Sequence, residues 1–382
     1  MNNEIAFYVH IPYCARRCGY CDFNTYTPSE LSISSDLSGV SRDYIDLLIA
    51  EINSARKISK ADLVPTIFFG GGTPTLMEPA DLGRVVTAIK NNFDLAPNAE
   101  ITTEANPDTV TPAKLAELRE AGINRISFGM QSAVPHVLAA LDRTHNPANV
   151  ARSVNDARAA GFDEVSVDLI YGTPGESMSD WQESIDVALS LPISHISAYA
   201  LIVEQGTKLG AQVKRGEVVM PDDDETADKY VLADAKFGAA GLNWYELSNW
   251  SKAGSESRHN LAYWNGDNWW GAGPGAHSHI DGRRWWNVKH PTAYKEKISS
   301  GQSPMYEEEV LNDEQKNSER MMLEIRLAKG IDAKTLDSGQ LAILESFKNQ
   351  GHLLADSWAA GRIVLSTSGR LIADRIVREI LS

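Results

Sequence analysis

Three cysteines are the side chains of this sequence best suited to metal chemistry. Cys14, Cys18 and Cys21 are the whole cysteine content of the 382-residue chain and have the spacing C-x3-C-x2-C. An odd number of thiols cannot form a complete set of disulfides, and three thiolates are one short of a structural zinc site. They can bind three irons of a 4Fe-4S cluster and leave the fourth iron open to a ligand. The spacing therefore predicts a cluster with an open iron, in preference to three incidental buried thiols.

A glycine-rich turn follows an apolar predicted strand. The turn GGGTPT at 70–75 contains Gly71, Gly72 and Thr73. Glycines let the backbone approach a ligand closely and offer it N–H and C=O groups, although such a turn is as commonly only a turn. The segment lacks the Gly-Lys-Ser/Thr end of a phosphate-binding loop.

Four polar side chains are predicted to meet at one edge of the sheet. Glu104 in TTEANP, Gln131 in ISFGMQS and Asp168 in VSVDLIYG stand at the ends of successive predicted strands. Arg143 lies in the helical stretch LAALDRTHN that follows. A single acid after a strand is usually a helix cap or a loop residue. Four polar groups converging beside a metal cluster favour a ligand with an amino group, a carboxylate and ribose hydroxyls.

The elements that must position these residues alternate along the chain from residue 5 to about 250. Amphipathic helical stretches separate the β-rich runs, and several of them end in glycine, as a helix C-cap does. Six or seven such units predict a parallel sheet with helices outside it, either a whole or partial barrel or a doubly wound sheet. Polar residues at strand ends favour a barrel. The predicted strands are 5–11, 66–70, 100–105, 125–131, 164–171, 195–203 and 244–248.

Composition narrows the class of protein. The net charge of −15 argues against a broad nucleic-acid-binding surface, and no apolar run reaches the length of a membrane span. Unpaired cysteines and an N-terminus without a basic signal region predict a cytoplasmic protein. From about residue 310 the pattern changes to helices and a short β-rich ribbon, which suggests a small winged-helix-like module. That module has no basic stripe, so we expect it to pack or dock rather than to bind DNA.

The motifs as a set resemble the radical S-adenosylmethionine (radical SAM) superfamily. YVHIPYC-x3-C-x-YC, GGGTPT, EANP, GMQS and DLIYG are similar, in order and spacing over residues 5–300, to the oxygen-independent coproporphyrinogen III oxidase family within it. The resemblance implies an α/β fold with a partial (β/α)6 barrel. It also implies a 4Fe-4S cluster on Cys14, Cys18 and Cys21, with SAM on the open iron and its reductive cleavage to a 5′-deoxyadenosyl radical as the chemistry supplied.

The same resemblance assigns candidate SAM contacts. Tyr8, Gly71 and Glu104 match positions that line one SAM site. The positions that match contacts to a second SAM in the oxidases are Tyr20, Gly72, Thr73, Gln131, Arg143 and Asp168.

Two departures from the oxidase pattern bear on function. The oxidases carry a fourth cysteine two positions after the third, whereas Cys21 is followed here by Asp22 and Phe23. They also have a long extension before the cluster segment, and Cys14 lies near the start of this sequence. Both departures argue against decarboxylation of coproporphyrinogen and against a second SAM.

An aromatic segment is the other unusual feature. Seven of the nine tryptophans lie between 244 and 286, which indicates either a core-facing cluster or a flat apolar wall for a porphyrin. An imidazole is the usual donor to heme iron, so His259 is a candidate axial ligand, with His277 and His279 as competitors. The heme-chaperone subfamily, which lacks the fourth cysteine, has a similar H-N-x-x-Y-W signature, found here at His259, Asn260, Tyr263 and Trp264.

The sequence therefore predicts a radical SAM partial barrel over 1–250, an aromatic heme-binding segment over 251–300 and a helical winged-helix-like domain over 301–382. The expected function is that of a heme chaperone, which binds a cluster, SAM and heme and delivers heme to acceptor proteins such as membrane-associated enzymes of respiration. The alternatives are an oxygen-independent coproporphyrinogen III oxidase and a radical SAM enzyme with another substrate. A cluster-dependent homodimer is also compatible with the sequence.

Overall fold

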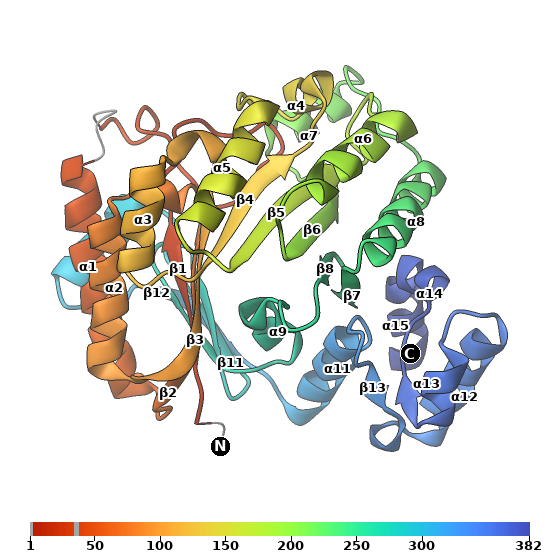
Figure 1. Ribbon diagram of the computed structural model, residues 1–382. Coiled ribbons are helices and arrows are strands. Elements are labelled where there is room, and N and C mark those ends of the chain that lie inside the picture. Colours follow the sequence, from red (N-terminus) through yellow and green to blue (C-terminus); the bar gives the residue numbers. More distant parts are fainter. Residues whose placement is uncertain (1–2, 34–37) are drawn as a thin grey trace.

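The computed structural model describes residues 3–33 and 38–382 and is built around one curved mixed sheet (Figure 1). Its centre consists of six parallel strands that lie side by side in chain order, each followed by helical segments on the outside. The strands are β1 (Ala6–Ile11), β2 (Leu63–Gly71), β3 (Asp94–Ala105), β4 (Arg125–Gln131), β5 (Glu164–Tyr171) and β6 (His195–Ala200). The predicted partial (β/α)6 barrel is confirmed.

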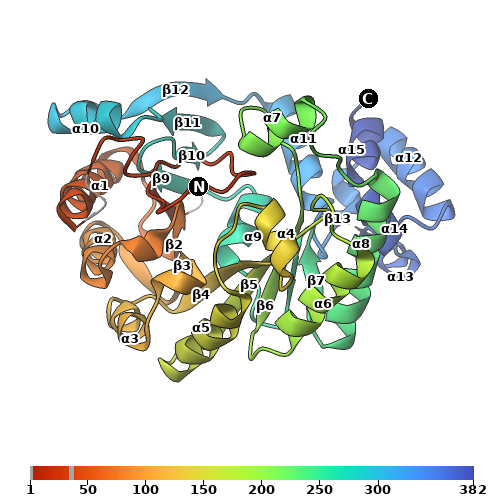
Figure 2. The ribbon, with the colours of Figure 1, turned by 90° about the horizontal axis from the view of Figure 1, so that it is seen from above.

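Helices cover the outer face of this sheet, as the view from above shows (Figure 2). The large covering helices are α1 (Ser38–Ile58), α2 (Pro79–Asn92), α3 (Pro112–Glu120), α5 (Pro147–Ala159), α6 (Met178–Leu189) and α8 (Asp223–Ala239). The shorter helices of this part of the chain are α4 (Pro135–Ala140), α7 (Lys208–Lys214), α9 (Arg258–Trp264) and α10 (Pro291–Ser299).

Strand alternation separates the core from the concave face of the sheet. In β1, Phe7 and Val9 are fully buried among the outer helices, while Tyr8 and His10 point to the other face and line a cavity. Burying one such apolar side chain stabilises the fold by about 1.5–3 kcal/mol. The same alternation in the neighbouring strands builds one continuous core outside and one polar wall inside.

The sheet continues beyond the barrel strands on both sides. β9 (Trp269–Ala272) pairs in parallel with β1, and the antiparallel strands β10 (His277–Ile280), β11 (Arg283–Asn287) and β12 (Met305–Val310) follow it to one edge. Segments from 251–300 thus extend the same sheet as the barrel. With the six parallel strands and two short strands at 243–246 and 249–251, they form one sheet of twelve strands.

The strand predicted over 244–248 is present only as far as residue 246 and is not a further parallel strand of the barrel. The chain instead forms a tight hairpin of β7 (Asn243–Glu246) and β8 (Asn249–Ser251), and β8 pairs antiparallel with β6. The carboxylate of Glu246 explains the turn, because it accepts hydrogen bonds from the backbone N–H of Ser248, at 3.0 Å, and from the side chain of Asn249.

Residues after β12 build a second hydrophobic core, separate from that of the barrel. Its elements are α11 (Asp313–Glu324), β13 (Ile331–Asp332), α12 (Ser338–Asn349), α13 (Ala355–Ala359), β14 (Arg362–Ile363), α14 (Thr367–Leu371) and α15 (Ala373–Leu381). Of the β-rich ribbon expected near 361–370, the structure has only β14, which pairs with β13. The module docks on α8, where Arg370 forms an ion pair of 2.5 Å with Asp234. No helix among the described residues is long and apolar enough to cross a membrane.

Candidate functional site

A cavity of about 1150 Å³ lies within the partial barrel. The cysteine loop after β1, the glycine-rich turn after β2 and the ends of β3 to β5 form its wall, as the carboxyl ends of parallel strands do in barrel folds. The structure brings 14 of the 16 predicted site residues to this wall. They are Tyr8, Cys14, Cys18, Tyr20, Cys21, Gly71, Gly72, Thr73, Glu104, Gln131, Arg143, Asp168, Asn260 and Tyr263.

The three cysteines are free thiols on one side of the cavity. Desolvation, with smaller contributions from the neighbouring Cys21 and Cys18, raises the pKa of Cys14 to about 11 although a hydrogen bond from Thr73 lowers it, so the thiol is protonated until a metal displaces the proton. Thr73 Oγ1 lies 3.9 Å from Cys14 Sγ, and Arg143 Nη1 lies 3.5 Å from Cys18 Sγ. Both are donors to sulfur and would stabilise negative charge there.

The donor set suits a cluster better than a single ion. Within the described part of the chain, no group of three His, Cys, Asp or Glu side chains is placed to hold one metal ion. The cysteines nonetheless interact electrostatically with one another, share one loop and face one cavity. Thiolates that bind separate irons of a 4Fe-4S cluster need to face one space without meeting at one point.

The glycine-rich turn packs against the start of the cysteine loop. The backbone N–H of Gly72 donates to the carbonyl of Ile11, at 2.7 Å, and that of Thr73 donates to the carbonyl of Tyr13, at 2.8 Å. A Cβ at Gly72 would collide with both carbonyl oxygens. The glycine is therefore required by this close approach of two backbones, which fixes the cysteine loop to the sheet.

Two carboxyl groups stand inside the cavity with different partners. Burial and, to a smaller extent, the charge of Asp168 raise the pKa of Glu104 to about 8, against a hydrogen bond of 3.1 Å from the N–H of Gly71 that lowers it. Burial also raises the pKa of Asp168, while the hydroxyls of Ser197 and Ser127 lower it. At neutral pH Glu104 is mostly protonated and acts as a donor as well as an acceptor.

Arg143 connects the end of β4 to the cysteine loop, and Gln131 ends the strand. Arg143 donates from Nη2 to the carbonyl of Gly129, at 2.9 Å, while its Nη1 faces Cys18. Gln131 ends the strand with φ of +62°, a left-handed conformation that is uncommon outside glycine and is often found at functional sites.

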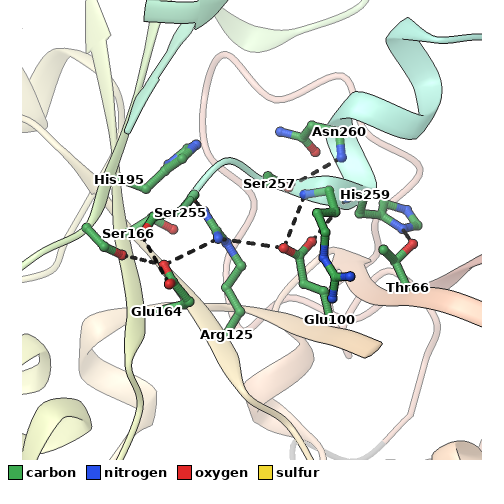
Figure 3. A network of polar contacts seen from close by, with 12 residues as sticks. Thr66, Glu100, Arg125, Glu164, Ser166, His195, Ser255, Ser257, His259 and Asn260 are labelled. Atoms are coloured by element: carbon green, nitrogen blue, oxygen red, sulfur yellow. Dashed lines mark hydrogen bonds and ion pairs between the residues drawn. The ribbon is translucent and has the colours of Figure 1, made fainter. Parts of the chain in front are cut away.

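His259 lies off the cavity wall. Figure 3 shows its ring beside the side chain of Thr66. Its side chain is buried, its Nδ1 is hydrogen-bonded to Thr66 Oγ1 at 2.8 Å, and its Nε2 is hydrogen-bonded to the hydroxyl of Tyr263 at 2.9 Å. Burial lowers the pKa of His259 to about 3, so the ring is neutral. Binding of an iron by His259 would require the loss of one of these hydrogen bonds.

A buried ion-pair network holds helix α9 in this place. The carboxylate of Glu100 accepts hydrogen bonds from the backbone N–H groups of Arg258 and His259, each at 3.1 Å. Arg125 lies 3.6 Å from Glu100 and 3.5 Å from Glu164, and it links the first turn of α9 to β3, β4 and β5 (Figure 3). The helix that carries Asn260 and Tyr263 is thus fixed at the amino ends of the barrel strands.

The tryptophans divide between core and cavity. Trp269 lines the cavity, whereas Trp250 is buried beside α8, and Trp270 and Trp285 pack edge to face in the core with ring centroids 5.2 Å apart. Trp264 also lies off the wall, where its indole lowers the pKa of Glu246, which burial raises to about 7. Three of the seven tryptophans are therefore core residues, and the other four are partly exposed.

Sequence patterns did not single out several residues of the wall. His10, Arg125, Ser127, His195 and Ser197 all line the cavity. Strand alternation could have found His10, because it lies two residues after Tyr8 in β1. The others become recognisable only when neighbouring strands are placed side by side.

We expect the variant Tyr263→Phe to lower the free energy of unfolding by about 1–3 kcal/mol, because it leaves the buried Nε2 of His259 without a partner. Urea unfolding followed by circular dichroism measures this change. Tyr306→Phe on β12, where the ring is 71% exposed, is the matched control and should change stability little. Equal stabilities of the two variants would contradict the hydrogen bond at His259.

Comparisons with known proteins identify the family of this chain. Residues 8–188 match the model of the radical SAM superfamily. The heme chaperone HemW of Mycobacterium tuberculosis (strain H37Rv) is 46% identical over 375 residues, which cover 98% of this chain and 94% of that protein. The chain belongs to the heme chaperone HemW family. The heme chaperone HemW of Bacillus subtilis is 34% identical, with 97% of each chain covered.

A solved structure supports the fold. Coproporphyrinogen III oxidase (HemN) from Escherichia coli, a radical SAM enzyme, superposes with a TM-score of 0.82 over 98% of this chain and 89% of that chain, at 20% identity. The resemblance to the radical SAM superfamily and to the HemW branch beside the oxidases is thereby confirmed. Membership of the superfamily implies a 4Fe-4S cluster and SAM, and the cavity contains donors that suit both.

Proposed function

We propose that this member of the HemW family is a cytoplasmic heme chaperone. It holds a 4Fe-4S cluster on Cys14, Cys18 and Cys21, binds SAM at the open iron, and carries heme to acceptor proteins such as heme enzymes of respiration. The observation that carries the proposal is the 46% identity to a heme chaperone HemW over nearly the whole length of both chains.

The cavity is large enough to hold more than one ligand. Its volume of about 1150 Å³ exceeds the roughly 300–1,000 Å³ of pockets for one drug-sized molecule. Tyr8, Gly71 and Glu104 are the residues that would hold SAM. In this assignment the backbone of Gly71 and the protonated Glu104 would offer polar contacts to SAM, and a cluster on the three cysteines would supply an open iron for its amino and carboxylate groups.

Asp22 and Phe23 distinguish the proposal from its rival, a coproporphyrinogen III oxidase. They follow Cys21 at the point where the oxidases carry a fourth cysteine, and both lie on the cavity wall. An acid and an exposed apolar ring therefore face the cavity where an oxidase has a thiol. The structural likeness to HemN concerns the fold alone.

One assay separates the two functions. Purified anaerobically and supplied with reductant, SAM and coproporphyrinogen III, the protein is expected to form no protoporphyrinogen, with a HemN enzyme as positive control. The same reconstituted sample is expected to bind heme in about equimolar amount, seen as a Soret band. Sustained porphyrin turnover without heme binding would overturn the chaperone proposal.

A further inference from the structure

His277 differs from the other histidines of the cavity in having an open ring. It is the first residue of β10, its side chain is exposed, and it lies on the cavity wall. Its ring stacks on Trp286, with centroids 5.6 Å apart and planes 22° apart. Among the described residues, no hydrogen bond occupies either of its ring nitrogens.

The other histidines near the cavity are committed to the fold. His10 is hydrogen-bonded to the hydroxyl of Tyr8 and to the carbonyl of Asn24, at 3.0 and 2.8 Å, and His259 is similarly held on both sides. His195 has a free Nδ1, but it begins β6 at the amino end of the barrel, where its ring is fully buried. Of these four histidines, His277 is the one with an exposed side chain.

Exposed apolar side chains also line this cavity. Phe23 is 61% exposed and Ile202 is 67% exposed, and both line the wall. The side-chain amide of Asn24 ties the segment of Phe23 to that of His277, because it donates to the carbonyl of Pro274 at 2.9 Å. An exposed phenyl ring and an open imidazole thus lie on two segments that are hydrogen-bonded to each other.

Two cationic side chains lie near the ring of His277. Burial lowers the pKa of His277, and the charges of Lys289 and Arg284 lower it further, which places both cations near the ring. Arg284 is paired with Glu309 and Glu319, whereas the exposed ammonium group of Lys289 makes no ion pair with the residues described. A neutral imidazole, apolar rings and an unpaired cation together match an iron porphyrin that carries carboxylates.

We propose that heme binds at this side of the cavity with His277 as its axial iron ligand, with Phe23 against the porphyrin and with Lys289 facing a propionate. The assignment rests on the proposed heme-chaperone function and names the ligand of that function. His259 then acts as a positioning residue, which holds Tyr263 on the cavity wall.

The test uses the cluster-reconstituted protein with ferric heme. The oxidised 4Fe-4S cluster is silent in electron paramagnetic resonance, so the heme signal reports the axial ligand directly. We expect His277→Ala to lose the histidine-ligated signal and to bind heme about tenfold more weakly, a change of about 1.4 kcal/mol. Added imidazole should restore the signal, and His277→Met should give a distinct, thioether-ligated spectrum.

His136→Ala is the matched control, since it removes an imidazole that is 59% exposed on α4, away from the cavity wall. This variant should behave as the wild type. If His277→Ala keeps the wild-type spectrum and affinity, the ligand assignment is wrong although the chaperone proposal stands. If the wild-type protein itself binds no heme, the chaperone proposal falls, and the ligand assignment falls with it.

Discussion

The variant Cys14→Ser, reconstituted anaerobically with iron and sulfide, is expected to lack the broad iron–sulfur absorption that the wild-type protein acquires. The chain has three cysteines, so it has no spare thiol to replace the missing one. Substitutions that only disturb the partners of metal ligands already lower metal affinity about 10–100-fold, and loss of a ligand itself should cost more. Iron content per chain measures the effect.

The surroundings of Cys14 make a hydroxyl a poor substitute. The thiol is largely desolvated and has a pKa of about 11 without metal, so iron must compensate for the loss of its proton. A serine hydroxyl is far less acidic than a thiol and would need a larger compensation. Ala15→Ser, an exposed position in the same loop, is the matched control and should retain the cluster. A normal iron content in Cys14→Ser would show that the cluster assignment is wrong.

The variant Arg125→Met is expected to lower the free energy of unfolding by about 3 kcal/mol, toward the lower end of the range for breaking a buried ion pair. The side chain of Arg125 is 3% exposed and that of Glu100 is 8% exposed, so the substitution leaves a carboxylate without its cation in the interior. The backbone N–H groups of Arg258 and His259 still bind Glu100, which is why the loss is not larger.

A surface ion pair provides the comparison for Arg125. Arg375→Met removes an arginine whose pair with Glu379 is 2.8 Å long but exposed, and such pairs contribute about 0–1 kcal/mol. Urea unfolding of both variants, followed by circular dichroism, measures the difference. Similar stabilities would contradict the role of Arg125 in anchoring α9 to the barrel.

The polar residues of the cavity wall can largely be predicted from the sequence, because most of them follow from the position of strand ends. Residues at or just after the ends of parallel strands meet at one side of a barrel, so Glu104 and Gln131 can be grouped from the sequence alone. Asp168 lies within β5 rather than at its end, although its side chain still lines the cavity. The cysteine loop follows the first strand and joins them for the same reason. The order and direction of the strands were enough to assign these residues to the cavity wall.

The histidines could not be ranked in this way. The choice between His259 and His277 depends on which ring nitrogens are already bonded, and the partners of His259 are Thr66, 193 residues away in sequence, and Tyr263. Its place off the wall also depends on Glu100, which fixes the start of α9 from β3. Such contacts between distant segments leave no pattern in the sequence around the histidine.

The hairpin of β7 and β8 was missed for a related reason. Alternation along 244–248 resembles one strand, and the turn depends on a side chain, Glu246, that hydrogen-bonds the backbone two residues later. The tryptophans, in turn, were predicted as a set, although β9 and β11 distribute Trp269, Trp270 and Trp285 between cavity and core.

Transfer of heme to an acceptor tests the central claim most directly. The heme-loaded, cluster-reconstituted protein is mixed anaerobically with the apo form of a respiratory heme enzyme, and the Soret band of the holo-acceptor is followed over time. We predict a transfer rate that rises with acceptor concentration, because the two proteins must meet for heme to pass between them. A rate that is independent of the acceptor and equal to spontaneous heme loss to an unrelated heme-scavenging protein would contradict the account.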